Sequence, residues 1–82
     1  MAADDPRVEA IRKLLSQKKF SRVRREAVRL GGDDPRFLSS VAVILAMAGQ
    51  TSSALFLLKE AKRLAPKDPM VHYRLGVVQE RP

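Results

Sequence analysis

Few side chains in this sequence have the types and spacing that catalysis or metal binding requires. The chain has one histidine, His72, and no cysteine, which excludes a thiolate metal site and a thiol nucleophile. The acidic pairs Asp4-Asp5 and Asp33-Asp34 each precede a proline, and a helix cap explains them without a metal. Gly31-Gly32 is followed by acids instead of the Lys and Ser of a phosphate loop. We therefore expect no enzyme, no metal and no cofactor, and we interpret His72 as a packed or rim side chain.

The sequence is also strongly basic. Sixteen Lys and Arg residues stand against nine Asp and Glu, a formal net charge of +7. Between Arg12 and Arg29 there are eight basic residues and one acid, Glu26. On a helix that begins near Phe20, four of them are expected to share the face opposite the apolar side chains. We call this set the basic stripe: Lys18, Arg22, Arg25 and Arg29.

The basic stripe has three interpretations. It is either a solvated face, a contact for an acidic protein, or a contact for nucleic acid or an anionic membrane. A protein that reads nucleic acid usually adds aromatic side chains for stacking, and here Phe20 is expected to face inward. Nucleic acid is therefore the less favoured of the binding partners.

The dipeptide Asp-Pro marks the starts of helices. It occurs at 5–6, 34–35 and 68–69, and in each case Asp can cap the helix that Pro opens. Two further helices are expected because polar breaks occur at 16–18 and 49–51. The sequence predicts an all-α protein with about five helices, near 6–17, 20–30, 35–48, 51–65 and 69–80.

Apolar periodicity supports this count. Apolar residues recur at helical spacing along the first two segments, whereas Val41 to Ala48 is apolar on every side. A helix of that kind is expected to have neighbours in several directions, so the third helix should be central. No alternation of apolar and polar residues is sustained, and strands are not expected.

The sequence contains an internal copy. Residues 26–35, EAVRLGGDDP, match residues 60–69, EAKRLAPKDP, at six of ten positions and an offset of 34. A fixed period of this size is typical of solenoids built from repeated hairpins.

From Pro35 onward the residues resemble the tetratricopeptide repeat, a helix-turn-helix unit of about 34 residues. Gly49 falls at its turn, Pro66 at its close, and Leu75-Gly76 match its Leu-Gly pair in the next unit. Other positions carry apolar or small residues where the family has its signature: Leu38, Val41, Ala42, Leu45, Ala54, Leu58 and Ala61.

The resemblance implies a right-handed superhelix of antiparallel hairpins in one domain, 1–82. Its parts would be a divergent hairpin at 6–34, a tetratricopeptide unit at 35–68, and a half unit or capping helix at 69–82. The first hairpin matches less well, because only 29 residues separate Pro6 from Pro35. A related helical-hairpin repeat or a short bundle is the alternative.

The resemblance also implies a function. First helices of such units line a concave groove that holds a partner segment, so we expect a non-enzymatic interaction module, such as an adaptor or chaperone subunit. The positions that carry over to the groove are Arg36, Ser39, Val43, Ala46, Met47, Met70, Tyr73, Arg74 and Val77. The carboxylate-clamp subgroup is not matched, because Ser39 and Val43 replace its Lys and Asn and only Arg74 fits. Alternatively, Val43, Ala46 and Met47 simply pack inside.

Three expectations concern the whole chain. The last helix carries apolar residues too widely spread for one hairpin to cover, so Leu75 and Val78 are predicted to drive self-association as a homodimer or to bind a subunit of a heteromeric complex. The longest apolar run, Val41 to Ala48, has eight residues, so no membrane span is expected. The first residues do not resemble a secretion signal, and we expect a soluble cytoplasmic protein.

Overall fold

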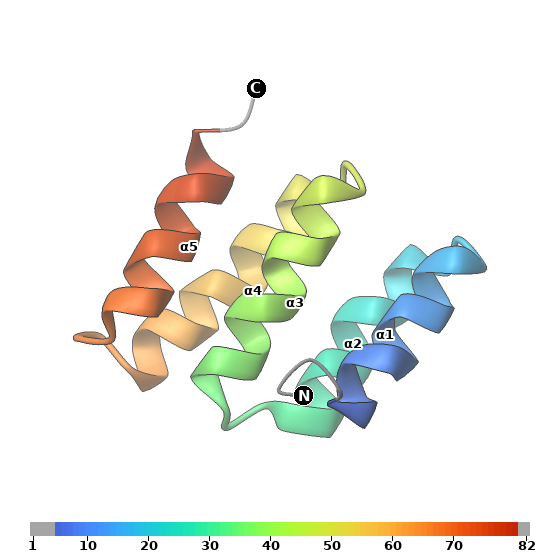
Figure 1. Ribbon diagram of the computed structural model, residues 1–82, viewed down its shortest axis with the longest axis horizontal. Coiled ribbons are helices and arrows are strands. Elements are labelled where there is room, and N and C mark those ends of the chain that lie inside the picture. The colour runs from blue at the N-terminus through green and yellow to red at the C-terminus, as the bar shows by residue number, and fades with distance from the viewer. Residues whose placement is uncertain (1–4, 81–82) are drawn as a thin grey trace.

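The computed structural model describes residues 5–80, which form five α-helices and, within that range, no strand. The helices are α1 (Pro6–Ser16), α2 (Phe20–Gly31), α3 (Pro35–Met47), α4 (Thr51–Leu64) and α5 (Pro69–Gln79) (Figure 1). The predicted all-α fold is confirmed, and every helix begins and ends within one residue of its predicted boundary.

The three Asp-Pro dipeptides begin α1, α3 and α5, as predicted. Each Pro is the first helical residue, and each preceding Asp side chain accepts a hydrogen bond from a backbone N–H of the first turn. The N···O distances are 2.9 Å for Asp5, 3.1 Å for Asp34 and 2.9 Å for Asp68. The caps satisfy donors that the start of a helix leaves unpaired.

The α1–α2 and α3–α4 turns have the same backbone conformation. The middle residue of each is left-handed, Lys18 with φ 59° and Gly49 with φ 82°. The next N–H donates to the carbonyl five residues earlier, at 3.0 Å in the first turn and 2.9 Å in the second. This is the hydrogen bond that closes a Schellman-type helix end. Because α2 begins only at Phe20, Lys18 lies in the turn, and its predicted place on the helical face of the basic stripe was wrong.

Exchanging the middle residues of these turns should change stability in opposite directions. Lys18→Gly is expected to raise the free energy of unfolding by about 0.5–1 kcal/mol, because glycine adopts a positive φ without steric cost. Gly49→Ala is expected to lower it by about 1 kcal/mol through the backbone alone, since a Cβ there meets no described atom within 4 Å. Urea unfolding followed by circular dichroism measures both changes. Equal midpoints for the two variants would contradict the turn geometry.

The helices lie in two layers, with α1, α3 and α5 on one side and α2 and α4 on the other (Figure 1). The predicted central helix is confirmed, because α3 packs against α2, α4 and α5. One cluster of buried apolar side chains receives residues from all five helices, among them Ile11, Val23, Leu45, Leu57 and Val71, each with no exposed surface. The handedness expected of a superhelix stays a prediction.

The last helix is covered better than its sequence predicts. Val78 is 1% exposed and Leu75 is partly buried against the core, so neither forms the exposed self-association surface that we predicted. The prediction assumed that one hairpin is too narrow to cover this helix, whereas both helices of the α3–α4 hairpin pack against α5. Two neighbours cover a wider arc of the helix than one, and the apolar residues left outside that arc, Met70 and Tyr73, lie on another side.

Candidate partner groove

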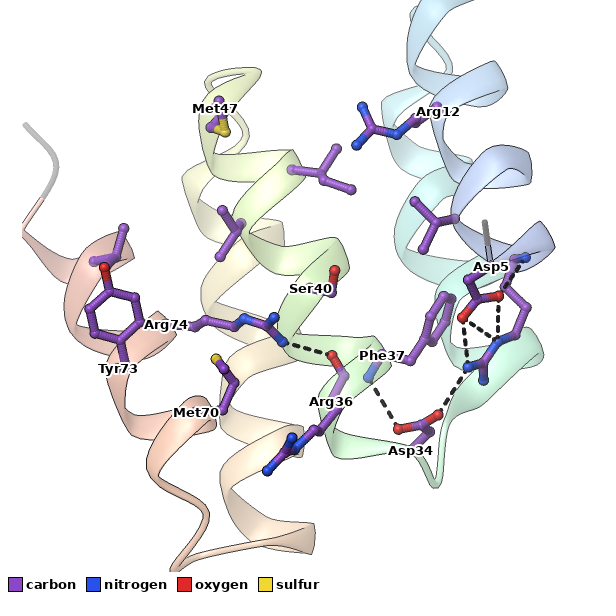
Figure 2. A pocket seen from close by; sticks show the side chains of 15 residues that line it. Asp5, Arg12, Asp34, Arg36, Phe37, Ser40, Met47, Met70, Tyr73 and Arg74 are labelled. Carbon is purple, nitrogen blue, oxygen red and sulfur yellow. Dashed lines mark hydrogen bonds and ion pairs between the residues drawn. The ribbon is translucent and has the colours of Figure 1, made fainter. Parts of the chain in front are cut away.

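A hollow of about 700 Å³ lies along the layer formed by α1, α3 and α5 (Figure 2). Its apolar lining comes from all three helices: Val8 from α1, Phe37, Val43, Ile44 and Met47 from α3, and Met70, Tyr73 and Val77 from α5. We call it the partner groove. The three helices that border it are those that begin with Asp-Pro, so the three caps set where each of these helices begins.

Most of the residues predicted for the groove line it. Seven of the nine predicted positions do so: Arg36, Val43, Met47, Met70, Tyr73, Arg74 and Val77. Met47 and Tyr73 are 70% and 69% exposed, so Met47 does not pack inside. Ala46, by contrast, is buried in the core.

Ser39 was wrongly placed in the groove. It has no exposed surface, and its hydroxyl donates to the backbone carbonyl of Arg36 at 3.1 Å. The next residue, Ser40, lines the groove in its place. One step along a helix turns the side chain by about 100°, which is enough to exchange a groove position for a buried one.

Arginine-aspartate pairs connect successive units at one end of the groove. Arg7 reaches Asp34 at 3.0 Å, and 29 residues later Arg36 reaches Asp68 at 3.1 Å. In both pairs the arginine is the second residue of one helix and the aspartate caps the next helix of the same layer. We call these two pairs the cap ladder. Arg7 also lies over the Phe37 ring, 4.2 Å from its centroid.

The arginines of the cap ladder lower the pKa values of the carboxyl groups that they contact, which include Asp5. The side-chain hydrogen bond from Arg7 lowers the pKa of Asp5, and that from Arg36 lowers the pKa of Asp68. At Asp34 burial raises the pKa, but bonds from the Phe37 N–H and from Arg7 outweigh it, and the net pKa is lowered. These carboxylates stay charged to a lower pH than usual, and their charges neutralise Arg7 and Arg36.

Two other arginines of the groove have no such partner. Arg74 donates through Nη1 to the Arg36 carbonyl at 3.1 Å (Figure 2) and to the Ser39 hydroxyl at 2.8 Å, and both acceptors are neutral. Within residues 5–80, no carboxylate lies within ion-pair distance of Arg74 or of Arg12, which lines the groove from α1. As far as residues 5–80 go, the groove therefore keeps two uncompensated positive charges beside its apolar lining.

Sequence reasoning missed the contribution of α1. Arg12, Ile44 and the cap ladder were not expected at the groove, because the register was carried over only from Pro35 onward. A signal was present: Asp-Pro-Arg occurs at both 5–7 and 34–36. The repeated arginine marks α1 as the counterpart of α3.

The basic stripe lies elsewhere, on α2. Arg22 and Arg25 are exposed there, while Arg29 pairs with Glu26 at 2.6 Å. The pair recurs 34 residues later as Arg63 with Glu60, at 3.1 Å. With Lys18 in the turn and Arg29 neutralised, the helical part of the stripe has two uncompensated charges among the described residues.

No group of three or more His, Cys, Asp or Glu side chains placed to hold a metal ion occurs in residues 5–80. His72 is exposed, and its Nε2 contacts the Pro66 carbonyl. Across the same residues, no helix has both the length and the apolar character that crossing a bilayer requires. Asp4, part of one predicted acidic pair, lies outside the described residues.

Protein-family models, curated proteins and solved structures were all compared with the chain, and none of the three comparisons found a match.

Proposed function

We propose that the chain is a non-enzymatic interaction module that holds a segment of another protein in the partner groove. One observation carries the proposal. Of the five large apolar side chains that are exposed in the described range, three line the groove: Met47, Met70 and Tyr73. Exposed apolar residues that gather in one concave site are typical of binding surfaces. Met and Tyr are also common at such sites, because Met adapts its shape and Tyr supplies a rigid ring.

The proposal includes the tetratricopeptide register and an adaptor or chaperone-type role. Several features support the register. The Glu-Arg pair recurs at 34 residues, the two turns share one backbone conformation, and the first helices of successive hairpins border the groove. A groove of this kind accepts a helix or an extended peptide through its apolar lining.

Binding should depend on Tyr73. A partner recovered with the full chain as bait and then purified is expected to bind Tyr73→Ala at least ~1 kcal/mol more weakly, as for an interface hot spot. Phe56→Ala is the matched control, because Phe56 is an exposed aromatic residue on α4, 43% exposed, that does not line the groove. Isothermal titration measures both affinities. Equal affinities for Tyr73→Ala and the wild type would show that the partner binds elsewhere.

A further inference from the structure

The charges of the groove indicate what its partner must carry. We propose that the bound segment is acidic as well as apolar, with one carboxylate received by Arg74 and another by Arg12. This inference rests on the proposed function, since it describes the occupant of the same groove.

Four arginines line the groove, and they divide into two kinds. Arg7 and Arg36 are neutralised by the aspartates of the cap ladder. Arg12 and Arg74 have no carboxylate within ion-pair distance among the described residues. Within the described part of the chain, the arginines that join helices are thus paired with carboxylates, and the two that border the open space are not. A carboxylate is the anionic group that another protein can bring to them.

Arg74 is held in position to receive a carboxylate. Its two hydrogen bonds, to Ser39 and to the Arg36 carbonyl, use Nη1 and fix the guanidinium against α3. The other N–H groups of the planar guanidinium stay available, and their fork geometry matches two carboxylate oxygens. Arg74 is also partly buried, so an ion pair there is screened less by water than one on an open surface.

The second charge lies across the groove. Arg12 extends from α1 toward α3, while Arg74 reaches α3 from the opposite side (Figure 2). The lining that α3 contributes is mainly apolar: it includes Val43, Ile44 and Met47, and Ser40 adds one hydroxyl. A segment that fills this space therefore needs apolar side chains in its middle and carboxylates toward its edges.

Other occupants fit the charges less well. A second copy of this chain carries a net charge of +7, so bringing it to a positive groove is opposed by repulsion. Nucleic acid carries the opposite charge, but the groove offers one exposed aromatic ring for stacking, Tyr73, among its mainly aliphatic side chains.

Random peptides displayed on phage, selected on the full immobilised chain, provide the probe. The selected peptides should combine Asp or Glu with large apolar residues. One of them is synthesised together with its counterpart in which Gln replaces each acid. Arg74→Gln and Arg12→Gln are each expected to lower the affinity for the acidic peptide about tenfold and to make that affinity less dependent on salt concentration. The Gln peptide should bind both variants with the affinity that it has for the wild type, because it has no carboxylate to form an ion pair with either arginine.

Controls separate this inference from the proposed function. Arg25→Gln removes an exposed arginine of α2 outside the groove lining and should leave affinity unchanged. Arg12 is exposed, so Arg12→Gln should fold even if Arg74→Gln, which loses contacts to α3, melts early. If Tyr73→Ala weakens the selected peptide while neither Gln variant does, the acidic partner is wrong and the groove stands. If Tyr73→Ala has no effect, the groove itself is wrong.

Two more results would overturn the inference. One is the selection of neutral or basic peptides, or of none. The other is a single-stranded oligonucleotide that displaces the peptide and depends on Arg74 more strongly than the peptide does, which would assign the groove to nucleic acid.

Discussion

Val78→Lys is expected to lower the free energy of unfolding by about 3 kcal/mol or more, and to leave the oligomeric state unchanged. Val78 is 1% exposed and belongs to the core cluster. The substitution loses the burial of an apolar side chain and brings an ammonium group into the apolar core cluster. The docking of α5 on α3 and α4 should fail first, because this helix ends the packed layer of described residues.

Val28→Lys is the matched control. Val28 lies on α2 with 46% of its surface exposed, so the same change there should alter stability by no more than about 0.5 kcal/mol. Urea unfolding gives the stability of both variants, and light scattering across concentration gives their mass. A stable Val78→Lys protein of lower mass than the wild type would mean that Val78 lies on an exposed self-association surface, and this would contradict the burial described above.

Gly31→Ala is expected to destabilise the fold by about 1–3 kcal/mol, although alanine is the better helix former. A Cβ on Gly31 would lie 2.5 Å from Cδ2 of Phe37 and 2.8 Å from Nη1 of Arg7. Neither neighbour is free to move, since Phe37 is 4% exposed and Arg7 is bonded to Asp5 and Asp34. The added methyl group must therefore separate the end of α2 from α3 or disturb the cap ladder.

The same substitution at Gly76 should act in the opposite direction. Gly76 lies inside α5, and a Cβ there meets no described atom within 4 Å. Gly76→Ala should therefore stabilise the protein by about 0.5–1 kcal/mol through helix propensity. Thermal unfolding of the two variants, at one pH and salt concentration, measures the difference. A stable Gly31→Ala protein would mean that α2 and α3 are not as close as the contact to Phe37 requires.

The helices could be predicted from the sequence because their limits are set locally. Asp-Pro caps a helix wherever it stands, and a Gly in a polar break ends one, so the starts at Pro6, Pro35 and Pro69 needed no knowledge of packing. The burial of α5, by contrast, could not be predicted from the residues of that helix alone. How many helices pack against Val78 depends on the crossing of elements that lie far apart in the chain, and periodicity does not contain that information.

The sequence predicted the residues that line the groove to within about one position along each helix. Alignment at Pro35 and Pro69 gave positions one turn apart correctly, such as Val43 and Met47. It failed at Ser39, where a difference of one residue decides between the core and the groove. The contacts of arginine could not be predicted, because its long side chain selects among several acceptors. Arg74 bonds to a serine and a carbonyl, while Arg36 takes the carboxylate.

The cap ladder has a consequence for how such a chain could lengthen. Residues 35–68 contain one whole pair of the ladder, because Arg36 near the start of α3 bonds to Asp68, which caps α5. A duplicated copy of this segment, inserted after Asp68, would bring a second arginine-aspartate pair of the same kind, and its aspartate would cap the helix that follows. Gene duplication would then add a unit without any compensating substitution at the junction. Met70 is the second residue of α5, the position that arginine has in α1 and α3, so α5 lacks the arginine of a further ladder pair.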